Sequence, residues 1–203
     1  MLVVLVFSVA LAARPTLGDG WYWEVGNGLG FLALALIFVL AFNGRGGLGG
    51  SAEHRWLGIG VFFAVFGHVL WFVLGDPVTW EYLKWGAPHY MVAGVLSAGL
   101  LLLVTFTSLI TLRNKSYTGY PSFQRWHRYL SVAILITALI HVLLSGFYTI
   151  YLWQMITLVI VGLAAYMLPT MITVDASFGR RNLAIVCVIA MVVYCVLRVG
   201  INR

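Results

Sequence analysis

Apolar residues fill most of this chain in runs of about 20, and short polar or glycine-rich stretches separate the runs. Unpaired backbone groups cannot face lipid, so each run is expected to be an α-helix. Residues 1–13 form a shorter apolar run, which predicts a first short span or anchor and leaves a cleaved signal segment open. The longer predicted spans are 21–42, 54–74, 90–112, 126–150, 153–174 and 183–201.

Composition agrees with a membrane location. Of the 203 residues, 62% are hydrophobic and 9% are charged, whereas roughly a quarter of a soluble domain is charged. The sequence therefore predicts an all-α integral membrane protein whose partner is membrane lipid. We expect a helical bundle of six core transmembrane helices plus one additional span.

The basic residues indicate orientation. The net charge is +6, but the twelve Lys and Arg residues are scattered and form no patch, which argues against nucleic-acid binding. Eight of them fall near residues 45, 115 and 180, and four fall on the other side. The positive-inside rule places the richer side in the cytoplasm and the C-terminus outside. Cys187 and Cys195 lack metal or redox spacing and are expected to be small buried side chains.

Four of the five histidines occupy two spans with one spacing. His54 and His68 are fourteen residues apart, and so are His127 and His141. Fourteen residues of α-helix turn to within about 40° of four full turns and rise about 21 Å, so both members of each set project from one face. The charge count makes the two helices parallel, which places His54 level with His127 and His68 level with His141.

Two imidazoles at the same depth provide the axial nitrogens of a six-coordinate haem iron, and two such levels predict two haems. Histidine within lipid is costly unless it is paired or ligated. Small residues near the histidines leave room for a macrocycle, although close helix packing also explains them. They are Gly58, Gly60, Ala64, Gly67, Ala133, Ala138 and Gly146. A haem-free transporter with a histidine proton relay is the alternative from another class.

The histidine motifs resemble the ferric-reductase-like transmembrane domain superfamily, which includes NADPH oxidases, ferric reductases, STEAP proteins and the bacterial MsrQ/YedZ haem subunit. The resemblance covers about residues 28–174 and implies a haem-binding domain at 21–175. We expect a short span or anchor at 1–20 before it, and in 176–203 an additional helix that has no counterpart in the six-span core of the family. The motifs are His54-Arg55-Trp56-Leu57-Gly58, Phe66-Gly67-His68, Arg125-Trp126-His127-Arg128-Tyr129-Leu130 and Ile140-His141.

This resemblance implies haem b on the cytoplasmic side at His54 and His127, a second haem b outside at His68 and His141, and outward electron transfer. One haem instead of two is left open. A bacterial inner membrane is the expected location.

Oxidases of this superfamily usually continue into a flavin and NADPH domain, and we expect this chain to lack one because its 203 residues leave no room for it. We therefore expect an oxidoreductase electron-transfer subunit whose flavin or quinone belongs to a partner: a donor flavoprotein or a membrane quinol. The acceptor is an outer-side protein or small molecule. A quinol-linked cytochrome b shuttle or assembly subunit is the second alternative. The glycine-rich stretch 44–50 has no preceding strand, which favours a loop over a dinucleotide site.

Arginines accompany the cytoplasmic histidines. Arg55, Arg125 and Arg128 are candidates to bind haem propionates, and the positive-inside rule explains them equally well. His89 is expected to be interfacial, with a role at the acceptor site as the alternative. An aromatic belt near the span ends is expected to include Trp71, Trp126, Tyr129 and Tyr148, with contact to the haem edges as the alternative.

Overall fold

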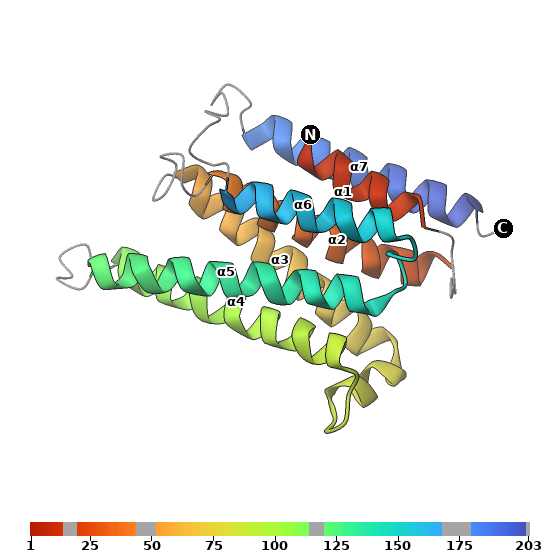
Figure 1. Cartoon of the computed structure of the whole chain (residues 1–203), viewed down its shortest axis with the longest axis horizontal. Coiled ribbons are helices and arrows are strands. Elements are labelled where there is room, and N and C mark those ends of the chain that lie inside the picture. The colour runs from red at the N-terminus through yellow and green to blue at the C-terminus, as the bar shows by residue number, and fades with distance from the viewer. Residues whose placement is uncertain (14–19, 44–51, 114–119, 168–179, 202–203) are drawn as a thin grey trace.

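A computed structural model describes residues 1–13, 20–43, 52–113, 120–167 and 180–201, and every regular element in these ranges is a helix (Figure 1). The all-α prediction is confirmed for this part of the chain. The elements are α1 (Leu2–Leu11), α2 (Trp21–Asn43), α3 (Ala52–Gly75), a 3-10 helix η1 (Pro77–Leu83), α4 (His89–Arg113), α5 (Tyr120–Ser145), α6 (Leu152–Met167) and α7 (Arg180–Ile201).

Five helices, α2 to α5 and α7, are long and apolar enough to cross a membrane, which makes this an integral multi-pass membrane protein. Helix α1 has 10 residues and α6 has 16. These two helices are shorter than the roughly 20 residues that a span requires. Residues 168–174 of the predicted sixth span lie outside the described residues, so the arrangement of six core helices plus one stays a prediction.

Helix α5 is shifted relative to its predicted bounds of 126–150. It begins six residues earlier, because Pro121 is compatible with the first turn of a helix. It ends at Ser145 because Gly146 has φ +69°, the left-handed conformation that terminates helices. Gly146 therefore turns the chain, and a Cβ added to it would meet no atom within 4 Å.

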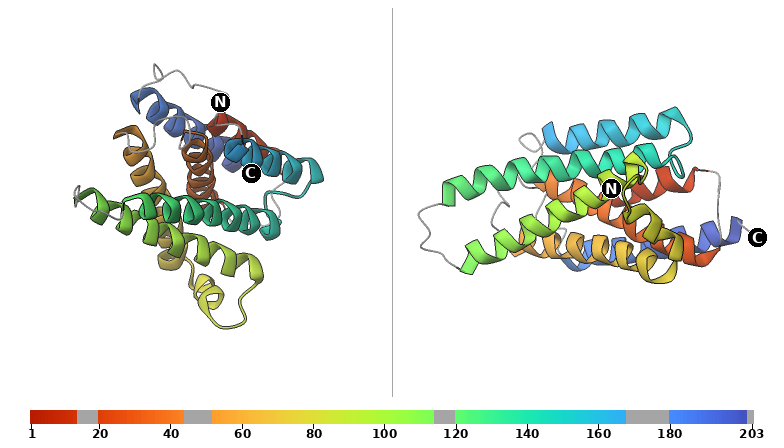
Figure 2. Two further views of the ribbon diagram at one scale, coloured as in Figure 1. Left: turned by 60° about the vertical axis from the view of Figure 1, so that its left-hand side comes forward. Right: turned by 90° about the horizontal axis from the view of Figure 1, so that it is seen from below.

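Helix α2 is the centre of the bundle. Its second half is almost wholly apolar and has buried hydrophobic side chains between Phe31 and Phe38, whereas the buried carboxylate of Glu24 lies near its start. It packs against α1, α3, α5, α6 and α7. In Figure 1, α1 and α7 lie along one side of α2 and the α4 and α5 pair along the other, and the left view of Figure 2 agrees.

The connection between α3 and α4 projects from one end of the bundle (Figure 1). The Asp76 carboxylate accepts a hydrogen bond from the Val78 N–H at 3.0 Å and starts η1. Trp80 and Trp85 are exposed there. This end also contains the second pair of histidines described below.

Candidate functional site

The four spaced histidines meet as two pairs. The ring centroids of His54 and His127 are 6.0 Å apart with an interplanar angle of 59°. Those of His68 and His141 are 6.5 Å apart at 72°. Helices α3 and α5 are therefore parallel and in register, and the predicted pairing is confirmed. We call the two sets the inner pair (His54 and His127) and the outer pair (His68 and His141).

These separations fit two axial ligands of one iron. A metal–imidazole bond is about 2.0 Å and a ring nitrogen lies roughly 1.2 Å from its centroid, so two opposed ligands hold their centroids about 6.4 Å apart. Both measured separations lie within half an ångström of that value.

Hydrogen bonds orient both rings of the outer pair. The Nδ1 of His68 lies 2.8 Å from the carbonyl oxygen of Gly26, and the Nδ1 of His141 lies 2.8 Å from that of Tyr90. A carbonyl only accepts, so each Nδ1 carries the proton and donates it. The proton-free nitrogen is then Nε2, whose lone pair is the one a metal binds.

His127 of the inner pair has a longer contact of the same kind. Its Nδ1 is 3.4 Å from the Ser108 hydroxyl oxygen. That hydroxyl donates its own proton to the Val104 carbonyl at 2.7 Å, so toward His127 it accepts. The arrangement again leaves Nε2 of His127 without a proton.

Two glycines make room for the outer rings. A Cβ on Gly94 of α4 would lie 2.8 Å from Nδ1 of His141. A Cβ on Gly30 of α2 would lie 3.0 Å from two atoms of the His68 ring. Of the small residues predicted to serve this purpose, Gly60 and Gly67 instead approach Leu36 and Leu29 of α2.

The two helices that carry the histidines pack against other helices and hardly against each other. Helix α3 packs mainly on α2 and α5 mainly on α4, whereas α3 and α5 make almost no close backbone approach. The imidazoles are thus the parts of α3 and α5 that come together. Aromatic rings border them: Phe72 is 5.3 Å from His68, and Phe123 is 5.4 Å from His127, between centroids.

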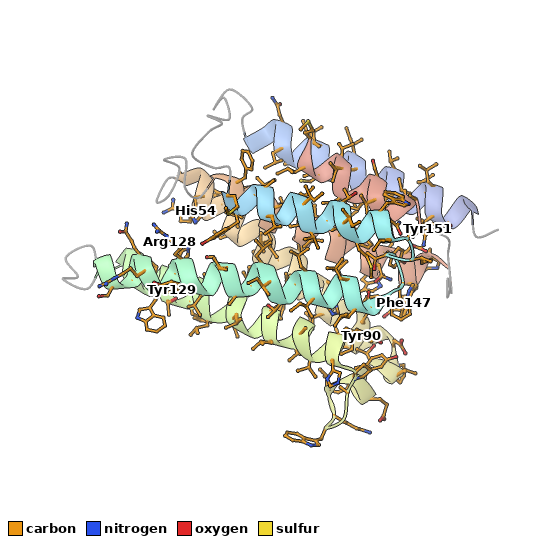
Figure 3. All side chains as sticks on the ribbon, in the orientation of Figure 1. His54, Tyr90, Arg128, Tyr129, Phe147 and Tyr151 are labelled. Atoms are coloured by element: carbon orange, nitrogen blue, oxygen red, sulfur yellow. The ribbon has the colours of Figure 1, made fainter. Side chains whose placement is uncertain are left out.

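The basic residues predicted near the inner pair are in place. Arg55, Arg125 and Arg128 are exposed, and Figure 3 shows Arg128 at the same end of the bundle as His54. Tyr90 lies at the opposite end. The positions agree with either role predicted for the arginines. His89 is exposed at the start of α4 and belongs to neither pair.

Sequence reasoning missed a buried polar cluster beside α2. Glu24, Arg198 and Tyr194 are buried, and Tyr148, expected in the aromatic belt, is buried with them. Oε2 of Glu24 accepts hydrogen bonds from the hydroxyls of Tyr148 and Tyr194 and from Nε of Arg198. The available signal was a carboxylate and a guanidinium inside apolar spans, because such groups are rare there.

In the described part of the chain, no three His, Cys, Asp or Glu side chains gather as a protein-only metal site would require. The imidazole donors occur in twos, which is the number a haem iron takes from the protein. Cys187 is buried and Cys195 half-buried, and both are free thiols. The chain matches no family model, no curated protein and no solved structure.

Proposed function

We propose that this protein is a membrane b-type cytochrome and acts as the electron-transfer subunit of an oxidoreductase. The observation that carries the proposal is the presence of the inner pair and the outer pair at two depths, each with a spacing compatible with one iron between its rings. Haem b bound there would supply reversible one-electron chemistry at its iron. His54 and His127 would hold one group, and His68 and His141 the other.

The protein's own contribution is to orient and space the imidazole rings. The carbonyls of Gly26 and Tyr90 keep the outer imidazoles in the metal-binding tautomer. The helices place the two levels about 21 Å apart along the bundle. The two imidazoles at each level would hold a haem b, and that group would supply one-electron exchange with the acceptor.

The distribution of charge supports the proposed direction of transfer and the proposed partners. Arg55, Arg125 and Arg128 are exposed and close in sequence to His54 or His127, where they would provide cations for propionates or for an anionic donor surface. The positive-inside rule assigns that end to the cytoplasm. We therefore propose a cytoplasmic flavoprotein or a quinol as donor and an outer-side acceptor, in a bacterial inner membrane.

Continuous helices favour this function over the transporter alternative. Transport sites near the bilayer midplane are typically built from interrupted helices. In the described residues, α2 to α5 and α7 each run as one uninterrupted helix.

The test is the absorption spectrum of the detergent-purified protein, first oxidised and then reduced with dithionite. We expect a Soret band and the sharpened visible bands of reduced bis-histidine haem b. A protein purified from haem-replete cells without a Soret band would contradict the proposal.

A further inference from the structure

A buried ion pair joins Glu24 of α2 to Arg198 of α7 near the outer pair. Glu24 is 0% exposed and Arg198 is 2% exposed. Nε of Arg198 is 3.3 Å from Oε2 of Glu24. Burying two charges costs free energy unless their partners are well arranged. Ionisable groups inside membrane spans are accordingly a pointer to function.

The pair is embedded in a network of donors. The hydroxyls of Tyr148 and Tyr194 donate to Oε2 of Glu24 at 3.0 and 2.9 Å. Burial raises the pKa of Tyr148 to about 12, and the Glu24 carboxylate adds to the rise, so this phenol stays protonated and donates. Arg198 also donates from a terminal guanidinium nitrogen to the carbonyl of Ala13. The network therefore joins α2 to α7, to the end of α1 and to the turn between α5 and α6.

Helix α2 connects this network with His68. A Cβ on Gly28 would lie 3.4 Å from the Tyr194 ring, so this face of α2 meets α7. Gly26 and Gly30 approach His68 instead. The Gly26 carbonyl accepts its hydrogen bond, and the absence of a side chain at Gly30 leaves room for its ring. A helix is about 10 Å across. The network and the outer pair thus lie on different faces of the same two turns of α2.

A second connection runs through the turn after α5. Phe147 precedes Tyr148 in the chain, and its ring centroid is 6.4 Å from that of Tyr90 and 6.3 Å from that of Trp23. The carbonyl of Tyr90 is the acceptor for His141. The carbonyls of Gly26 and Tyr90 are therefore both linked to this network. Gly26 lies on the same helix as Glu24, and Tyr90 contacts Phe147, the chain neighbour of Tyr148.

We propose that Glu24 and Arg198 are positioning residues for the outer pair. Together they anchor α2 and the turn after α5 behind the two imidazoles, and their opposite charges cancel near the outer site. The inference rests on the proposed function, because a redox group at the outer pair reports the local field. No electron or proton passes through the ion pair itself.

The proposal predicts opposite effects from removing either charge. Glu24→Gln leaves an unpaired cation, which favours the reduced form and raises the outer midpoint potential. Arg198→Gln removes a positive charge beside the Glu24 carboxylate, which lowers that potential. The double variant restores most of the wild-type value, because it removes both charges. The inner potential moves less in every case, because the inner pair lies about 21 Å further along the bundle.

The experiment is a spectroelectrochemical titration of the purified haem-loaded protein and its variants. Lys84→Gln is the matched control, because it breaks the exposed ion pair with Glu81 at the same end of the bundle. Tyr194→Phe tests the inference without altering either charge, and we expect potentials close to wild type. If Arg198→Gln does not fold, the potentials of Glu24→Gln and Tyr194→Phe are compared instead, because only the first of these two variants alters a charge.

Shifts of one sign in both single variants, equal shifts at both haem levels, or no shift would overturn the positioning role. A shift in Tyr194→Phe as large as that in Glu24→Gln would overturn it as well. These results leave the proposed function standing. A wild-type protein without haem bands overturns the proposed function itself.

Discussion

The imidazoles of His68 on α3 and His141 on α5 lie with their centroids 6.5 Å apart. Each donates its Nδ1 proton to a main-chain carbonyl of another helix, that of Gly26 on α2 or that of Tyr90 on α4. The pair is thus held from outside by α2 and α4, while α3 and α5 supply the rings. Ligand rings oriented by hydrogen bonds of this kind bind metals more tightly than unsupported ones.

Gly94→Ala should damage the outer site. Its new Cβ would lie 2.8 Å from Nδ1 of His141, which is too close for any real contact, so the ring must move. Overpacking of this kind costs about 1–3 kcal/mol. We expect the variant to lose most of one haem per chain, measured by the pyridine haemochrome assay, and to retain the other.

Gly99→Ala on the same helix is the control for that variant. A Cβ at Gly99 would meet nothing within 4 Å, and alanine favours a helix more than glycine does. Haem content should stay at the wild-type level. Equal losses in both variants would show that α4 tolerates no alanine, and the account of Gly94 would be wrong.

Ser108→Ala should weaken the inner site alone. The change removes the acceptor for the Nδ1 proton of His127, and loss of such a partner typically lowers metal affinity about 10- to 100-fold. Because the contact is 3.4 Å long, we expect the lower end of that range. Haem transfer to excess apomyoglobin measures it, with Thr157→Ala on α6 as a remote control. Faster release from the outer site instead would contradict the assignment.

Arg198→Ala should destabilise the fold strongly. It removes the Arg198 guanidinium from the buried ion pair with Glu24, and breaking a buried ion pair from one side costs about 3–5 kcal/mol. Lys84→Ala removes a pair whose side chains are 64% and 62% exposed, and should cost less than about 1 kcal/mol. Thermal unfolding in one detergent compares them. Similar melting temperatures for the two variants would be incompatible with a buried Arg198.

Orientation in the membrane can be read by thiol labelling. Trp85 is exposed in the connection before α4, and Ser122 is exposed at the start of α5, at the other end of the bundle. The variants Trp85→Cys and Ser122→Cys therefore place one thiol at each end. In a background lacking Cys187 and Cys195, an impermeant maleimide should label position 85 in right-side-out vesicles and position 122 in inverted ones. The reverse pattern would invert the proposed direction of electron flow.

The histidine pairs were predictable because they depend on helical periodicity and on the orientation that the basic residues indicate. Once 54–74 and 126–150 are taken as parallel helices, the fourteen-residue spacing fixes which face and which depth each ring occupies. Errors of several residues at the ends of α5 leave that register unchanged, since the histidines lie within the helix in both versions.

The supports of the site were not predictable in the same way. The carbonyls of Gly26 and Tyr90 carry no side-chain signature, and their role depends on how α2 and α4 pack. The union of Glu24 with Arg198 joins residues 174 positions apart. The only signal for Glu24 and Arg198 in the sequence was that charged residues are rare within apolar spans. The count of basic residues that gives the orientation obscures this signal, because it treats Arg198 as a surface charge.

Haem stoichiometry in paired variants tests the central claim most directly. The account predicts two haems b per wild-type chain. It predicts one in the His54→Ala/His127→Ala variant and one in the His68→Ala/His141→Ala variant, with different midpoint potentials in the two. A chain without haem, or with the same haem content in all three proteins, would contradict it.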